Sequence, residues 1–375
     1  MAITRLGPNQ DITAAKIAGQ INFKNLIING DMSIAQRGTS TSGVTTTDGY
    51  YACDRWRSQT DIGTWTISQS TDVPTGQGFV NSFKMDCTSA GTSNADEVSI
   101  RQKIEGQFLQ YLAYGTSSAK SLTISFWIKS NKTGDYTISF NNVNSTQERL
   151  AGYNYTIDTA NTWEKKTFTL TGDSSYGFDN TNGTELELYW WFSAASAFRT
   201  GTVSNTWQNY NAANHAISTL AGLGGSTSDY VNITGVQLEA DTAASDFEFL
   251  PYDVNLRRCQ RYYENHTANG SVNIGHAYNT TQARTYFQYR VKKRAAPTIT
   301  LATAGNGDGE ISFLTKGGAY VGTIGTHTAI NVAIDRFNIS VNSGTYSSTG
   351  WVEGDALFFY VNGNNYVIWE ADAEL

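Results

Sequence analysis

Two glutamates in one strand-like run are the first residues whose types and spacing could do chemistry. The run ELELYWWFS places Glu185 and Glu187 on the same face of a strand, about 7 Å apart. Glycoside hydrolysis uses two carboxyl groups roughly 5 to 10 Å apart, and one of them must keep its proton near neutral pH. Nothing in the surrounding sequence marks such a carboxyl group, and glutamates on an outer strand face are ordinarily solvated. We therefore keep polysaccharide hydrolysis only as an alternative.

Nucleophilic and metal chemistry have weaker candidates. The sequence contains no G-x-S-x-G elbow, and its histidines lie in polar, loop-like stretches (His215, His266, His276 and His327). Oxygen ligands that could hold Ca²⁺ cluster in GFDNTNGTE (Asp179, Asn180, Asn182, Glu185) and in GNGDGE (Asn306, Asp308, Glu310). Neither run has the complete spacing of a calcium loop, and Asx turns explain both. We expect no catalytic residues, no metal and no cofactor.

Aromatic side chains supply the best candidates for ligand binding. Tyr189 and Trp191 alternate away from the apolar face of their strand, and Trp207 and Tyr210 follow in a long connection. An exposed flat ring gives the C–H face of a sugar a surface to stack on. We therefore predict a glycan-binding group of Tyr189, Trp191, Trp207 and Tyr210. Packing of these rings beneath the connection 193–228, or against a neighbouring subunit, remains the alternative.

Composition limits the class of protein. The chain has 375 residues and a net charge of −7, and charged residues make up 16% of it, against roughly 25% in an average globular protein. Ser, Thr, Asn and Gly must therefore form much of the surface, as in extracellular β-proteins. The charge gives no basic footprint for nucleic acid, and no apolar run approaches the ~18 residues of a membrane-spanning helix. The N-terminus lacks the apolar centre of a secretory signal, so we expect synthesis in a cytoplasm.

Hydrophobic alternation predicts the fold. From Asn25 onward, short runs of period two alternate with turn residues, for example in FKMDC, VSIRQKI, SLTISFWIKS and ELELYWWFS. In YVNITGVQLEA the apolar set slips by one residue between Ile233 and Val236, which predicts a bulge at Thr234 and Gly235. About eight such strands predict an all-β fold with an antiparallel jelly-roll β-sandwich over residues 25–254.

One segment breaks this pattern. In LPYDVNLRRCQRYYENH, Leu256, Cys259 and Tyr263 lie at helical spacing, which predicts a short connecting helix over 255–266 with Asn255 as its N-cap. Such a helix is too short to be stable alone and must pack against another surface. Alternation resumes in 267–375, which predicts a smaller C-terminal β-sandwich or barrel domain. Cys53, Cys87 and Cys259 are widely spaced, and we expect three reduced, buried thiols.

Two resemblances add to this interpretation. NLIINGDM, SLTISFWIKS, TWEKKTFTLTGD and VNITGVQLEAD resemble, in order, core strands of the jelly-roll carbohydrate-binding modules attached to polysaccharide-degrading enzymes. Met32 stands where that family usually has an aromatic residue after NGD. The chain from Asn25 onward also resembles bacteriophage tail-fibre and virion structural proteins, through NLIINGDMSIAQRGTS, YACDRWR, LRRCQRYYE, RVKKRAAPTITL and the terminal ADAEL.

The second resemblance implies a function. Residues 1–24 are similar to the virion-docking ends of such fibres and carry a weak apolar stripe of Ile12, Ile17 and Ile21. The resemblance to tail fibres implies a homotrimer, with Leu256, Cys259 and Tyr263 packing at the junction or against the same helix in sister chains. The chain would be made in the host cytoplasm, join other virion proteins and bind a host surface polysaccharide without enzymatic activity. A purely structural collar, capsid or baseplate role is the main alternative, and a depolymerase is the other.

Overall fold

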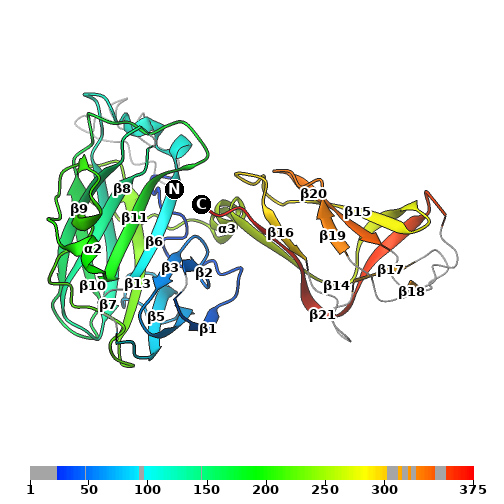
Figure 1. The fold of residues 1–375 in the computed structure, drawn as a ribbon, viewed down its shortest axis with the longest axis horizontal. Helices are drawn as coiled ribbons and strands as arrows, with labels where there is room; N and C mark the ends of the chain where they lie inside the picture. Colours follow the sequence, from blue (N-terminus) through cyan, green and yellow to red (C-terminus); the bar gives the residue numbers. More distant parts are fainter. Residues whose placement is uncertain are drawn as a thin grey trace, which may run out of the picture.

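Antiparallel sheets build the molecule. The structure, a computed structural model, describes residues 23–46, 48–92, 97–144, 146–301, 311–314, 320–321, 327–342 and 352–375. Figure 1 shows two β-bodies, with the C-terminus and a short helix, α3 (Tyr252–Gln260), between them. The pairings within the described sheets are all antiparallel, which confirms the all-β prediction. Ile12, Ile17, Ile21 and the calcium candidates Asn306, Asp308 and Glu310 lie outside the described residues.

The larger body is a jelly-roll sandwich of two sheets. In spatial order, the first sheet holds β1 (Ser40–Val44), β4 (Thr64–Ser70), β5 (Ser82–Ser89), β13 (Tyr230–Glu239), β7 (Leu122–Ser130) and β10 (Glu164–Leu170). The second holds β12 (Gln208–Asn209), β9 (Arg149–Ile157), β8 (Gly134–Asn142), β11 (Thr184–Ser193), β6 (Val98–Glu105), β3 (Arg57–Thr60) and β2 (Asp48–Tyr50). The connections contain α2 (Ser196–Arg199), η1 (Gly106–Phe108), η2 (Gln110–Leu112) and η3 (Ala212–Asn214).

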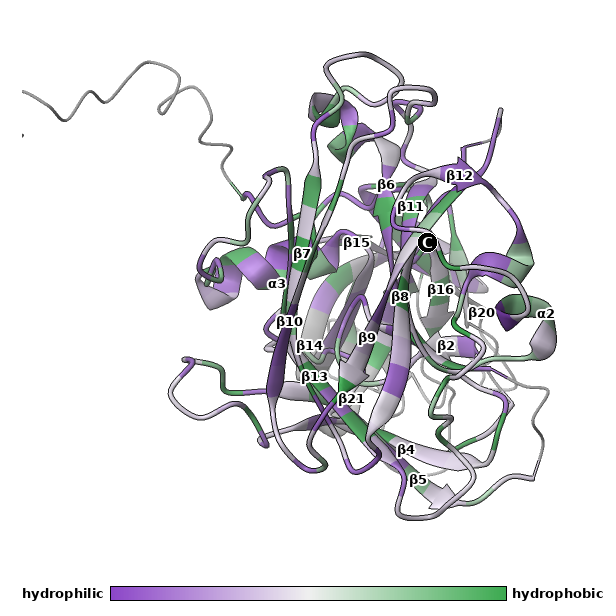
Figure 2. Ribbon diagram, turned by 90° about the vertical axis from the view of Figure 1, so that its left-hand side faces the viewer, coloured by the Kyte–Doolittle hydropathy of each residue, from purple (hydrophilic) through white to green (hydrophobic). Residues whose placement is uncertain are grey.

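The core lies between these sheets, as the alternation predicts. The inner residues of β7 and β11 are at most 1% exposed (Leu122, Ile124, Phe126, Ile128, Leu186, Leu188, Trp190 and Phe192). The ring of Trp190 lies 5.6 Å from that of Trp56 and 5.7 Å from that of Phe126. Apolar segments along β7 contrast with the polar β10 at the sandwich edge in Figure 2. All three cysteines are buried and free, which confirms that prediction.

The predicted bulge in β13 is confirmed and contacts the segment that follows Asn25. The register of β13 against β7 shifts between Thr234 and Gln237, and Gly235 has a φ of 60°. The amide of Val236 donates to the Gly30 carbonyl oxygen at 2.9 Å. A Cβ added at Gly30 would lie 2.1 Å from the carbonyl oxygen of Val236. The bulge therefore lets β13 hold the segment after Asn25 at close range.

The smaller body is one bent antiparallel sheet. It contains β18 (Tyr320–Val321), β17 (Ile311–Leu314), β21 (Ala356–Asp372), β14 (Tyr263–Asn279), β15 (Gln282–Gln288), β20 (Arg336–Asn342) and β19 (His327–Ile330), and β16 (Thr298–Leu301) pairs with β21. β16 also lies against β19, so these strands curl toward a barrel. Phe287, Phe337, Phe359 and Trp369 form its core.

The connecting helix starts earlier than predicted. α3 spans Tyr252–Gln260 with Pro251 as its N-cap, so the prediction of 255–266 is wrong at both ends. Asn255 is not a cap but a buried residue that donates to Asp31 and Ser33 at 3.1 and 3.0 Å. Because a proline can open a helix without losing a hydrogen bond, the helix begins directly after it. No helix within the described ranges is long and apolar enough to cross a membrane.

Candidate functional site

The outer face of the second sheet gathers aromatic and charged side chains. In β6 and β11 the residues opposite the core pair across the strands, Tyr189 with Arg101 and Glu187 with Lys103. The connection after β11 adds further rings to the same face. We call this group the Tyr189 face and define it by six residues: Arg101, Lys103, Glu187, Tyr189, Tyr210 and His215.

Histidine 215 is the centre of its aromatic contacts. The His215 ring lies 5.5 Å from the rings of both Tyr189 and Tyr210 and 5.3 Å from that of Trp191. Tyr189 and Trp191 themselves stack at 5.4 Å with 12° between their planes. The cluster therefore joins two residues of β11 to the long connection that follows the strand.

A buried hydrogen-bond chain fixes this cluster to the sheet. Trp191 donates through Nε1 to Ser139 Oγ at 2.9 Å, and Ser139 Oγ lies 3.2 Å from His215 Nδ1. Burial lowers the pKa of His215 to about 4 against a weaker opposing effect of Glu187. His215 is therefore a buried imidazole that stays neutral down to well below its ordinary pKa.

Alternating charges border the rings. The guanidinium carbon of Arg101 lies 4.7 Å from the centroid of the Tyr189 ring, a cation–π contact. Arg101 also pairs with Glu97 at 3.0 Å, and Lys103 pairs with Glu187 at 3.1 Å. The Tyr189 hydroxyl donates to Glu187 at 2.5 Å, and burial followed by the Glu187 charge raises the pKa of this phenol. Donors and acceptors thus alternate along the face.

This arrangement suits a polar ring ligand. Tyr210 is 38% exposed and Tyr189 is half-buried, whereas Arg101 and Glu187 are 9% and 8% exposed. Charged groups that already hold partners can share their remaining lone pairs or protons with hydroxyl groups of a ligand. A few aligned polar groups around an apolar ring are what recognition of a small polar ligand requires.

Two of the four predicted rings are placed differently from the prediction. Trp191 is 1% exposed and is covered by Phe198 and His215 of the following connection, so it cannot serve as an exposed stacking surface. Trp207 is half-buried and lies 5.9 Å from Tyr114 over the main core. The alternative of packing beneath the connection is therefore correct for Trp191. The alternation predicts which side of the strand Trp191 faces. It does not show that the connection 193–228 folds back over this residue.

The paired glutamates are buried rather than solvated. Glu185 accepts hydrogen bonds from the Asp179 amide at 3.2 Å and from Asn144 at 3.4 Å, and burial raises its pKa. Glu187 is occupied by Lys103 and Tyr189. Glu185 thus closes the loop that includes Asp179. Within the described part of the chain, no three His, Cys, Asp or Glu side chains are grouped to hold a metal ion.

The predicted junction residues Leu256, Cys259 and Tyr263 make contacts with other residues of the same chain. Cys259 is fully buried with Ile28, Ile34 and Tyr262, and Leu256 packs against this cluster. Tyr263 is not on the helix stripe, because it begins β14, where its ring lies 3.6 Å from the Arg37 guanidinium carbon. Tyr262, in the turn after α3, belongs to this buried cluster in place of Tyr263. The apolar face of α3 is therefore covered by the segment 28–34.

Ion pairs extend this junction into both bodies. Arg55 pairs with Glu374 near the C-terminus, and its guanidinium carbon lies 3.5 Å from the centroid of the Tyr262 ring. Lys293 is buried and pairs with Glu264 at 2.7 Å. These charges belong to the two β-bodies. From the basic segment itself, Arg261 pairs with Glu105 at the end of β6 at 2.7 Å, so the segment also contributes to the junction.

Sequence reasoning missed Arg101 and His215. The alternation in VSIRQKI predicts which residues face the core, and Arg101 lies on the opposite face. The pattern within one strand does not show that Arg101 pairs with Tyr189 of β11. His215 was interpreted as a loop residue without a role, although it is 3% exposed. Cross-strand register could have found Arg101, but the contact of His215 with β11 depends on how a long connection folds back.

Comparisons with known proteins give distant likenesses. No protein-family model matches the chain, and no curated protein matches it. Among solved structures it is similar to the enzymatically active domain of bacteriophage CBA120 tailspike protein 4, at 13% identity and a TM-score of 0.32 over 58% of this chain and 21% of that one. It is similar to the CBM22-2 xylan-binding domain from Paenibacillus barcinonensis Xyn10C, at 14% identity and a TM-score of 0.29 over 50% and 91%.

A third likeness is to the family 11 carbohydrate-binding module from Clostridium thermocellum, at 13% identity and a TM-score of 0.25 over 55% of this chain and 99% of that one. The chain spans about a fifth of the tailspike chain and nearly all of this module. At such scores the likenesses carry no argument, and the sandwich fold is established by its own strand pairing.

Proposed function

We propose that this chain is a non-enzymatic glycan-binding protein of a bacteriophage virion, in which the Tyr189 face binds a host surface polysaccharide. The observation that carries the proposal is Tyr210, which is 38% exposed and whose ring lies 5.5 Å from His215, the residue that also contacts Tyr189, on the outer face of a jelly-roll sheet. Rings supply apolar contact for sugar C–H groups, and the flanking charges supply hydrogen bonds to hydroxyls.

The resemblance of the sequence to tail fibres supports the virion assignment. Residues 1–24 would attach to other virion proteins, and the β-bodies would project toward the host. We further propose a homotrimer, since several weak sites gain about 10² to 10⁴ in avidity when geometry lets them bind together. Because α3 is covered within its own chain, a threefold contact would use another surface. The molecular mass in solution tests whether three chains associate.

Binding of the full chain to a panel of host polysaccharides tests the function. We expect Tyr210→Ala to weaken binding by up to roughly tenfold, since the specific contacts of an aromatic ring contribute about 0.5 to 1.5 kcal/mol. Tyr252→Ala removes a more exposed tyrosine from α3, 63% exposed against 38% for Tyr210, and should leave binding unchanged. Absence of any glycan binding would favour a purely structural virion role. Shortened polysaccharide chains after incubation would instead indicate a depolymerase.

A further inference from the structure

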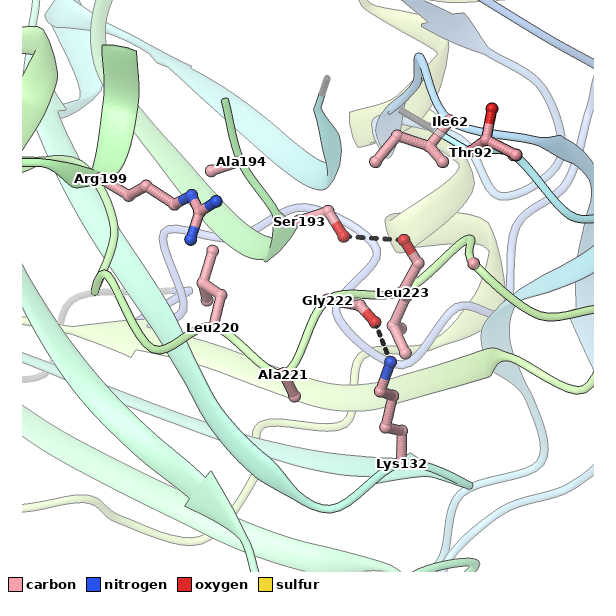
Figure 3. Close-up of a pocket in the computed structure, with 12 residues that line it drawn as sticks. Ile62, Thr92, Lys132, Ser193, Ala194, Arg199, Leu220, Ala221, Gly222 and Leu223 are labelled. Atoms are coloured by element: carbon pink, nitrogen blue, oxygen red, sulfur yellow. Dashed lines mark hydrogen bonds between the residues drawn. The ribbon is translucent and has the colours of Figure 1, made fainter. Parts of the chain in front are cut away.

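A cavity lies at one end of the sandwich, where Ile62 and Leu223 of the apolar core form part of its lining. Its volume is about 330 Å³, within the range of small-ligand pockets. Loops between strands form its walls, with Ile62 from one connection, Thr92 from another and the 220–225 segment along a third side. Figure 3 shows two cationic side chains entering it, Arg199 from α2 and Lys132 from the turn after β7.

These two cations have no acidic partner in the cavity. No Asp or Glu is among the described residues that line it, and neither Lys132 nor Arg199 forms a salt bridge with a described residue. Lys132 donates instead to the Gly222 carbonyl oxygen, and Arg199 donates through Nη1 to the Ser218 carbonyl oxygen at 2.9 Å. Two positive charges therefore share a recess in a chain whose net charge is −7.

The guanidinium group of Arg199 also has unused hydrogen-bonding capacity. Its Nε is buried and has no hydrogen-bond partner. A buried donor left unpaired is unfavourable, and an acceptor brought within hydrogen-bond distance would satisfy it. The planar fork of arginine fits a carboxylate with two parallel hydrogen bonds, and a lysine adds a point charge.

The remaining wall fits the body of a sugar. Ile62, Leu220 and Ala221 offer apolar contact to ring C–H groups. The Ser193 hydroxyl, which donates to the Leu223 carbonyl oxygen at 2.7 Å, keeps lone pairs for a ligand hydroxyl. The cavity thus combines a site for an anion with a site for a small polar ring.

We propose that this cavity binds the carboxylate of an acidic sugar unit, with Arg199 and Lys132 as the anion-binding residues. The assignment rests on the proposed glycan-binding function and narrows its ligand to polysaccharides that contain uronate-type sugars. The Tyr189 face would then contact neighbouring sugar units of the same polysaccharide. The two sites are linked in the sequence, because Phe198, which covers Trp191, directly precedes Arg199.

Titration of the full chain with sodium glucuronate and with glucose tests the proposal. We expect glucuronate to bind roughly tenfold more tightly than glucose, as a charge-assisted hydrogen bond implies, and to weaken as salt is added. Arg199→Gln and Lys132→Gln should each abolish this preference. Arg199→Lys keeps the charge and should retain part of it, which separates the loss of a ligand contact from a disturbed loop. Lys165→Gln, on exposed β10, is the matched control and should behave as the wild type.

The outcomes separate the cavity from the Tyr189 face. Equal binding of glucuronate and glucose, or unchanged glucuronate binding in both glutamine variants, would overturn the cavity assignment. Inorganic sulfate binding that depends on Arg199, without glucuronate binding, would overturn it in favour of a sulfate site. Polysaccharide binding that depends on Tyr210 but not on the uronate content of the polysaccharide would support the proposed function and overturn the cavity assignment. Glucuronate binding without any polysaccharide binding would refute the proposed function instead.

Discussion

Arg261 and Glu105 form a two-point ion pair at the junction of the two β-bodies. Nε and Nη2 of Arg261 donate to the two carboxylate oxygens of Glu105 at 2.8 and 2.7 Å. The Tyr262 hydroxyl donates to the same carboxylate at 2.5 Å. The last residue of β6 therefore holds the residues that follow α3, and the second body begins at a fixed position relative to the first.

Glu105→Gln should destabilise this junction. Burial alone would raise the pKa of Glu105, but the hydrogen bonds from Arg261 and Tyr262 outweigh it and lower that pKa. Breaking a buried pair leaves one charge unpaired, and we expect a loss of about 3 kcal/mol in the free energy of unfolding, measured by urea titration at neutral pH. Because the folded pKa is depressed, this loss should shrink as the pH falls below about 4.5, where the unfolded chain begins to bind the proton, and disappear once the pH is below the lower pKa of the folded state.

Arg257→Ala is the control for this variant. Arg257 is exposed on α3, the helix that Arg261 directly follows, and a surface substitution should change the free energy of unfolding by less than about 0.5 kcal/mol. Equal effects of the two substitutions would show that the ion pair does not hold the junction.

His215 should make the sandwich sensitive to acid. Its pKa falls from 6.5 to about 4 on folding, mainly because of burial, so between these pH values the unfolded chain binds a proton that the folded chain does not. Stability is therefore lost as the pH falls from about 6.5 to 4, by on the order of 3 kcal/mol from this residue. Urea unfolding at several pH values should show a shallower dependence in His215→Asn than in the wild type.

The matched variant for the pH experiment is His276→Asn, which replaces an exposed histidine on β14 in the other body. It should leave the acid dependence of the sandwich as steep as in the wild type. The same slope in His215→Asn would mean that His215 is not the group whose protonation the fold resists.

Local patterns predicted those features that depend on neighbouring residues. The period of two identified the inner faces of β7 and β11 and the slip in β13, because these follow from strand geometry alone. Long-range contacts were beyond it. The partner of Asn255 is Asp31, more than two hundred positions away, and nothing near Asn255 distinguishes a cap from a buried donor. For the same reason the sequence left two alternatives open for Trp191, exposure or packing beneath the connection 193–228, and only the structure decides for the second.

Trp191→Ala distinguishes a buried ring from an exposed binding surface. Since Trp191 is 1% exposed and donates to Ser139, its truncation should lower the free energy of unfolding by about 4 kcal/mol. Tyr210→Ala, on the exposed side of the same cluster, should cost less than about 1 kcal/mol. Thermal unfolding of the two variants side by side measures the difference. A nearly neutral Trp191→Ala would restore the exposed platform that the sequence suggested.

Gly30→Ala should disrupt the contact between the start of the sandwich and the bulge of β13. The added Cβ would lie 2.1 Å from the carbonyl oxygen of Val236, and a backbone oxygen held within a strand cannot rotate aside as a side chain could. We expect a loss of about 3 kcal/mol, as for other overpacked sites, measured by urea unfolding. Gly225→Ala is the control, because a Cβ there meets nothing within 4 Å and should leave stability within about 0.5 kcal/mol. If both variants unfold at the wild-type urea concentration, the approach of Gly30 to Val236 is looser than described, and β13 does not fix the segment that covers α3.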